Sequence, residues 1–153
     1  TKELNFFALG PAAGAALILV DLPGYGYARE TKSRVAQWTA LIIDYLRGRP
    51  ELRRVFVLVD SRHGLKDSDR DVMSMLDEVA VSYQIVLTKI DKLKKNELES
   101  RIEEIRAELK KHPASHPVIH ATSSEKGTGI AELRAELASL ADEAALGYKP
   151  QSG

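Results

Sequence analysis

Hydrophobic residues along the chain gather either in short runs rich in β-branched side chains or in longer stretches with helical spacing. Three apolar runs predict buried parallel strands, over Ala15–Val20, Val55–Val59 and Gln84–Leu87. A shorter run predicts a fourth strand over Val118–Ala121, and an initial edge strand is expected over Leu4–Leu9. Each of the three buried runs is followed by a polar loop, and these loops are where chemistry is expected.

Four helical patterns separate these strands. Apolar residues recur with helical periodicity in the segments 35–45, 72–79, 98–109 and 130–140. Strands that alternate with helices of this length indicate right-handed βαβ units. We therefore expect an α/β fold with three layers around a mostly parallel sheet, forming one domain over residues 1–146 with a flexible tail over 147–153.

The composition narrows the classes of function. The chain has 22 basic and 22 acidic residues and no formal net charge, so it lacks the overall positive field of a protein that binds nucleic acid by charge alone. It has no cysteine, which excludes a disulfide scaffold and thiolate chemistry. The longest apolar run, from Ala12 to Val20, is too short to span a bilayer. We expect a cytoplasmic protein with no membrane span.

The loop after the first buried run reads Asp21-Leu22-Pro23-Gly24. An aspartate at this position can hold a water on Mg²⁺, and a glycine N–H with no side chain in its way can approach a γ-phosphate. A plain turn built by Asp, Pro and Gly explains the D-x-x-G motif equally well when the motif is taken alone.

The loops after the third buried run and after the fourth, shorter run fit the recognition of a guanine base. In Thr88-Lys89-Ile90-Asp91, the carboxylate matches the N1–H and N2–H₂ donors of guanine, and the lysine stem can lie along the base. Alternatively, these charges form a solvated surface pair. In Thr122-Ser123-Ser124, small residues let backbone N–H groups reach the guanine O6, although a simple cap of the last helix explains this segment better when it is taken alone.

The three loops together favour a nucleotide site, because they follow successive strands in the order typical of translation-factor-like GTPases. No G-x-G-x-x-G follows a strand, which disfavours a dinucleotide-binding domain. Four longer segments resemble the EngB (YihA/YsxC) family, within the TrmE-Era-EngA-EngB-Septin-like ribosome-assembly GTPases: Thr1–Phe7, Asp21–Ala28, Asp60–Asp69 and Leu87–Leu93.

This resemblance implies a P-loop NTPase of the Ras-like type that binds GTP and GDP, requires Mg²⁺, and assists large ribosomal subunit assembly and normal division or septation in bacteria. It implies a monomer whose partner is the large-subunit precursor. It also implies that Thr1 contacts Mg²⁺ directly and Asp21 through water. Thr122 departs from the phenylalanine usual in the family. The implied GTP-binding residues are Thr1, Lys2, Glu3, Asp21, Leu22, Pro23, Gly24, Thr88, Lys89, Ile90, Asp91, Thr122, Ser123 and Ser124.

No catalytic residue is assigned. Tyr25 stands after D-x-x-G, where Ras-like enzymes have a glutamine that orients water, so we expect slow hydrolysis that the ribosomal particle accelerates. Two alternatives stay open at this point. One is a GTP-dependent ribosome-binding module that does not hydrolyse GTP, and the other is a degenerate scaffold that binds no nucleotide.

The 153 residues contain no G-x-x-x-x-G-K-[ST], the P-loop that cradles the α- and β-phosphates. The resemblance places this loop and its strand before Thr1, with the strand between those that end at Asp21 and Asp60. We therefore expect these residues alone to bind GDP weakly or not at all, and to be inactive.

Two further patterns have no role in this interpretation. His112, His116 and His120 have the spacing of a metal site on a helix, but Pro113 and Pro117 interrupt any helix there, and a surface loop is the better interpretation. The Asp60–Asp69 segment begins the second helical pattern. Capping of that helix by Asp67 or Ser68 is its minimal explanation.

Overall fold

The computed structural model describes residues 5–9, 17–21, 40–41, 43–44 and 52–141. The chain divides into two compact units, one formed by Thr1–Ile42 with Arg134–Gly153 and the other by Ile43–Leu133. The four described residues of the first helical pattern, 40–41 and 43–44, are helical, and the rest of that pattern lies outside the described residues. The expectation of one domain over 1–146 stays a prediction.

The first unit contains a two-stranded antiparallel sheet of β1 (Asn5–Leu9) and β2 (Leu17–Asp21). Its register pairs Asn5 with Asp21 and Leu9 with Leu17. Both predicted strands are present, and the edge strand, for which no direction was predicted, pairs with β2 in the antiparallel direction. The connection between the two explains this, because a parallel pair needs a crossover of about a dozen residues or more.

The second unit contains a three-stranded parallel sheet in the order β3 (Val55–Asp60), β4 (Tyr83–Thr88) and β5 (His120–Ala121). Asp60 pairs with Thr88, and Leu87 pairs with Ala121, so the carboxyl ends of all three strands meet at one edge. The predicted parallel α/β arrangement is confirmed. The last strand is shorter than its predicted range because it pairs with β4 only through His120 and Ala121.

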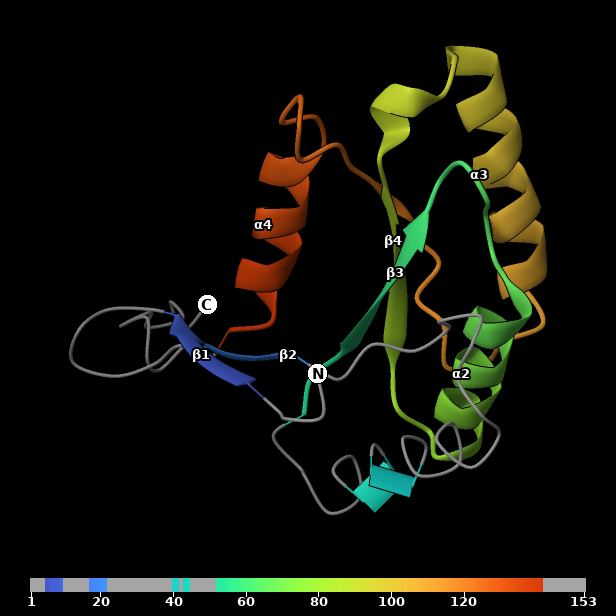
Figure 1. Ribbon diagram of the computed structural model, residues 1–153. Coiled ribbons are helices and arrows are strands. Elements are labelled where there is room, and N and C mark those ends of the chain that lie inside the picture. Colours follow the sequence, from blue (N-terminus) through green and yellow to red (C-terminus); the bar gives the residue numbers. More distant parts are fainter. Residues whose placement is uncertain (1–4, 10–16, 22–39, 42, 45–51, 142–153) are drawn as a thin grey trace, which may run out of the picture. The chain divides into compact units, whose positions relative to one another are not determined.

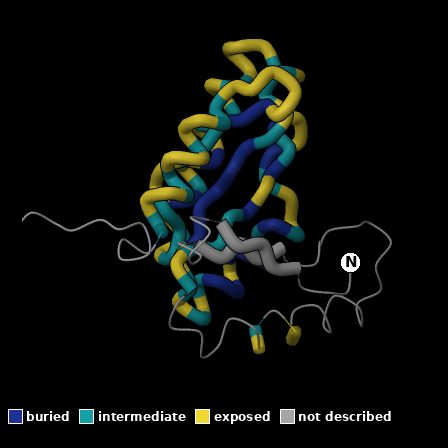
Figure 2. Tube along the Cα trace, turned by 90° about the vertical axis from the view of Figure 1, so that its left-hand side faces the viewer, coloured by how far each residue is buried: buried dark blue, intermediate teal, exposed yellow. Residues whose placement is uncertain are grey.

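Two helices, α2 (Asp67–Glu78) and α3 (Lys95–Leu109), lie along the same side of this sheet (Figure 1). A single 3-10 turn, η1 (Ile90–Lys92), follows β4, and α4 (Ile130–Ser139) follows β5. No helix among the described residues is long and apolar enough to cross a membrane. Buried residues run through the middle of the unit, and the outer helix faces are exposed (Figure 2). The core residues include Val57, Val59, Met73, Leu76, Ile85, Leu87, Ile105 and Leu109.

The start of α2 differs from the prediction. The N-cap residue is Lys66, whose N–H donates to the Asp69 carboxylate at 2.8 Å. Asp67 is 98% exposed and pairs with Arg70 at 3.0 Å, so capping by Asp67 or Ser68 was wrong. The physical reason is position, because a carboxylate at the third residue of a helix reaches back to the N-cap N–H, and here that residue is Asp69.

Candidate functional site

The loop that follows β4 turns sharply at the carboxyl edge of the parallel sheet. Lys89 adopts the left-handed conformation, with φ 58° and ψ 35°, directly before η1. A lysine pays a steric cost in this conformation, which persists only where the surroundings fix it. The next residue, Ile90, donates its N–H to the Thr122 carbonyl at 3.2 Å. The turn is therefore tied to the loop that follows β5.

Asp91 and Ser123 meet where these two loops converge. The Ser123 hydroxyl donates to Asp91 Oδ1 at 2.8 Å and accepts the N–H of Lys126 at 3.1 Å. Ser123 is fully buried, and its own N–H donates to the Thr128 carbonyl at 2.9 Å. One serine thus joins the 122–128 loop to Asp91, whose side chain keeps 10% of its surface exposed.

The hydrogen bond from Ser123 is the main reason that the pKa of Asp91 is held below its ordinary range. Desolvation opposes this effect, and the Lys92 ammonium, 3.7 Å from Oδ2, adds to the lowering of the pKa. Lys92 also lies 3.6 Å from Glu125. Asp91 is therefore an ionised carboxylate at neutral pH, able only to accept hydrogen bonds.

Thr122 anchors the second loop to the strand beside it. Its hydroxyl and its N–H both donate to the Leu87 carbonyl at 2.8 Å, and the residue is buried. The hydroxyl is therefore occupied within the sheet. Of the predicted segment 122–124, only Ser124 is exposed.

Two glycines shape the 122–128 loop and the entry into α4. Gly127 and Gly129 have φ values of 76° and 73°. A Cβ at Gly129 would lie 2.0 Å from the Ala121 carbonyl oxygen, whereas a Cβ at Gly127 would meet nothing within 4 Å. Glycine is required at 129 for close packing as well as for backbone conformation, and at 127 for conformation alone.

A second carboxylate, Asp60, ends β3 at the same edge of the sheet. Arg62 holds both of its oxygens, from Nε at 3.1 Å and from Nη2 at 2.7 Å. The Lys89 ammonium lies 3.5 Å from Asp60 Oδ2. The pKa of Asp60 is well below its usual range, chiefly because of the hydrogen bond from Arg62. Sequence reasoning assigned Asp60 no role at this site, although its position at the end of a strand was a signal.

The remaining predicted site residues lie in the first compact unit, and most of them fall outside the described residues. Asp21 is the last residue of β2. The predicted residues Thr1, Lys2, Glu3, Leu22, Pro23 and Gly24 lie outside the described residues. The part of the chain that the structure describes contains no cluster of three or more His, Cys, Asp or Glu side chains that could hold a metal ion. The Mg²⁺ contacts of Thr1 and Asp21 stay predictions.

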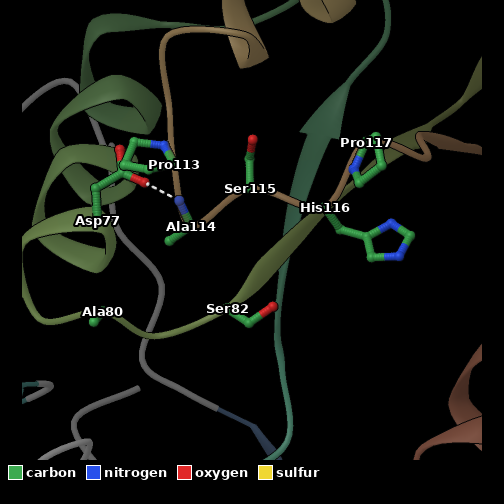
Figure 3. A pocket seen from close by; sticks show the side chains of 8 residues that line it. All are labelled: Asp77, Ala80, Ser82, Pro113, Ala114, Ser115, His116 and Pro117. Carbon is green, nitrogen blue, oxygen red and sulfur yellow. Dashed lines mark hydrogen bonds between the residues drawn. The ribbon is translucent and has the colours of Figure 1, made fainter.

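A pocket of about 420 Å³ lies at the amino-terminal end of β4, away from Asp91, and is lined by Asp77, Ala80, Ser82 and residues 113–117 (Figure 3). Asp77 accepts the Ala114 N–H at 3.0 Å and contacts His112 Nδ1 at 2.6 Å. Residues 112–119 form a loop, as predicted, and within it the His112 side chain is 13% exposed and packs against Asp77. The acidic group of the pocket is already paired.

Comparison with known proteins identifies the class to which this fold and site belong. The family described as the elongation factor Tu GTP binding domain matches residues 12–143. The chain belongs to this family. The structure of translation elongation factor SelB from Methanococcus maripaludis, in complex with the GTP analogue GPPNHP, matches 92% of the chain and 28% of SelB with a TM-score of 0.70. At 20% identity, this match shows the fold.

Closer relatives carry the name "Probable GTP-binding protein EngB". The protein from Rhodospirillum rubrum is 61% identical over 142 residues, which cover 92% of this chain and 62% of that protein. The protein from Hyphomonas neptunium is 56% identical, with 92% and 64% covered. The resemblance to the EngB family is thus confirmed. The chain spans slightly less than two thirds of the length of these relatives.

The glycine pair gives a first prediction. In the full-length gene product, Gly129→Ala is expected to lower the free energy of unfolding by roughly 2 kcal/mol or more, because backbone strain and a clash with Ala121 add. Gly127→Ala is the matched control and should cost only about 1 kcal/mol, from strain alone. Urea unfolding measures both. Equal losses would contradict the role of close packing at Gly129.

Ser123 gives a prediction about pH. A carboxyl with a lowered pKa in the folded state adds stability above its unfolded pKa and loses it as pH falls through the folded value. Ser123→Ala removes the main cause of lowering at Asp91, so its destabilising effect should be larger at about pH 7 than at about pH 3. Urea unfolding of the full-length gene product at both pH values tests this. Ser124→Ala, at the exposed neighbouring position, should show no such pH dependence.

Proposed function

We propose that this chain forms the guanine-reading part of a GTP- and GDP-binding domain. The single observation that carries the proposal is the carboxylate of Asp91, which is ionised, partly exposed and fixed by Ser123 at the carboxyl edge of a parallel sheet. Ligands of open α/β sheets bind at this edge. Two carboxylate oxygens offer about four acceptor positions, and the Ser123 hydroxyl and the backbone N–H of Asp91 take two of them, which leaves capacity for the N1–H and N2–H₂ groups of guanine.

The other predicted residues have complementary roles in this proposal. The stem of Lys89 lies along the base, and Thr88 and Ile90 shape the turn. In the 122–124 segment, the N–H groups of Thr122 and Ser123 are bonded within the chain, so the N–H of Ser124 is the one that reaches O6. The phosphates and Mg²⁺ are bound by Thr1, Lys2, Glu3 and the segment Asp21–Gly24. When bound there, Mg²⁺ neutralises charge on the phosphate oxygens.

The biological role that fits this domain is assembly of the large ribosomal subunit, with normal cell division or septation, in the bacterial cytoplasm. This part of the proposal is supported by the match to relatives named EngB and by the four segments that resemble that family. The intact protein acts as a slow Mg²⁺-dependent GTPase, and the ribosomal precursor supplies the acceleration that Tyr25 does not provide.

Asp91→Asn tests the guanine assignment in the full-length gene product. An amide presents donors where guanine also presents donors, so affinity for GDP should fall by roughly 10- to 100-fold. Xanthosine diphosphate has a carbonyl at the position of the guanine amino group, and its affinity should rise in the variant. Isothermal titration calorimetry with both nucleotides measures the change of preference.

The control is Asp71→Asn, which makes the same chemical change at an exposed position of α2. Its GDP affinity should equal that of the wild type. Loss of GDP binding in Asp91→Asn without any gain for xanthosine diphosphate would mean that Asp91 supports the loop and does not read the base. A wild-type protein that binds ADP as well as GDP would contradict the proposal entirely.

Ribosome-dependent turnover separates the proposed GTPase from its alternatives. The full-length gene product should hydrolyse GTP slowly alone, and large-subunit precursors should increase the rate at least about tenfold. Phosphate release, with small subunits as the control particle, measures this. GTP-dependent co-sedimentation without turnover would favour the non-hydrolysing binding module, and binding that ignores nucleotide would favour the scaffold.

A further inference from the structure

The carboxylate of Asp60 has a fixed position that the proposed function does not yet use. Its two oxygens are held by the Arg62 side chain, and Oδ1 also accepts the Arg62 backbone N–H at 3.0 Å. The Asp60 side chain is only 21% exposed. Four hydrogen bonds from Arg62 hold this carboxylate in place at the end of β3, so a mobile lysine that pairs with it must approach it.

The backbone around Asp60 is braced from a second element. Arg101, on α3, donates from Nε to the Ser61 carbonyl at 3.1 Å and from Nη2 to the Arg62 carbonyl at 3.3 Å. Gly64, which has φ 69°, leaves room for this arginine, because a Cβ there would lie 2.7 Å from Arg101 Nη1. The loop after β3 is thus clamped onto α3, and its carboxylate is presented at the carboxyl edge of the sheet.

The cation that Asp60 contacts belongs to the neighbouring loop. Lys89 Nζ lies 3.5 Å from Asp60 Oδ2, although the Lys89 side chain is 55% exposed and is otherwise free to sample many rotamers. Register pairing of Asp60 with Thr88 puts the two residues on adjacent strand ends. The backbone of Lys89 has the left-handed conformation, which residues other than glycine rarely adopt, and this conformation sets the direction in which its side chain leaves the loop.

We propose that Asp60 is a positioning residue, which holds the ammonium of Lys89 so that the lysine stem lies ready against the face of the guanine base. This inference rests on the proposed function and deepens it. A lysine that is already confined loses less side-chain freedom when the ligand arrives, and this gain from preorganisation appears as affinity. Asp60 acts through Lys89 and makes no contact with the edge of the base that Asp91 reads.

A double-mutant cycle in the full-length gene product tests the coupling, with GDP affinity measured by calorimetry. Asp60→Asn should weaken GDP binding about three- to fivefold, the range expected when a partly exposed ion pair is lost. Lys89→Met keeps most of the methylene stem and removes the charge. In the Lys89→Met background, Asp60→Asn should have no further effect on GDP binding, because the contact through which it acts is gone.

Inosine diphosphate provides the readout that a merely structural role would change. It lacks the 2-amino group, so the ratio of GDP to inosine diphosphate affinity reports on the edge contact of Asp91, while both bases share the face beside Lys89. Asp60→Asn should lower the affinity for both nucleotides by the same factor and leave the ratio of the two affinities unchanged. The control is Asp67→Asn, which removes an acidic charge beyond the same strand and should not alter GDP affinity.

Three results would overturn the inference. One is an equal loss of GDP affinity with and without the Lys89 charge, another is a fall in the nucleotide ratio, and the third is no loss in Asp60→Asn. If Asp60→Asn does not fold, Asp60→Glu in the same cycle measures the coupling, since the longer carboxylate keeps its charge and shifts the contact with Lys89. A wild-type protein that binds no GDP would overturn the proposed function itself, which distinguishes that failure from this one.

Discussion

The parallel register of β3, β4 and β5 is the constraint on which the candidate site depends, because it brings three loops from distant parts of the sequence to one edge. A slip of one residue would turn every side chain of a strand to the opposite face of the sheet. The buried amide of Gln84 opposes such a slip. It accepts from Arg54 at 2.7 Å and donates to the Val118 carbonyl at 2.9 Å, so it links the segments on both sides of β4. A polar group this deeply buried tolerates little displacement of its partners.

The strands β3 and β4 could be predicted nearly to their ends, because each is a run of apolar residues rich in β-branched side chains. The prediction of continuous burial holds for β4, whereas β3 buries Val57 and Val59 but leaves Leu58 63% exposed. The predicted Val55–Val59 and Gln84–Leu87 became Val55–Asp60 and Tyr83–Thr88. The antiparallel direction of β1 and the short length of β5 were not predicted, for a different reason. The direction of pairing and the number of paired residues depend on both strands, so the hydrophobic pattern of one strand cannot predict them.

Some contacts of the candidate site could likewise be predicted from the sequence and others could not. Asp91 and Ser123 were both expected in it, because each belongs to a motif with a fixed place after a strand. The contacts of Asp60 with Lys89 and of Asp77 with His112 were not expected. The second pair is 35 residues apart, and its meeting follows from how α2 packs beside the loop before β5. Contacts of this kind leave no periodic pattern in the sequence, because each partner taken alone looks like an ordinary polar residue at the surface.

Two carboxylates at one edge of the sheet have different surroundings, and this difference separates what each can do. Asp60 is held by a guanidinium and faces a lysine, so its charge is already committed to cations within the chain. Asp91 receives a neutral hydroxyl on one oxygen, while the nearest ammonium on the other is 3.7 Å away, so its acceptor capacity is only partly used. A carboxylate that accepts hydrogen bonds from a neutral base needs these free acceptor positions. The surroundings of Asp60 would not suit a carboxylate that reads a base, because Arg62 donates to both of its oxygens and leaves few acceptor positions for other donors.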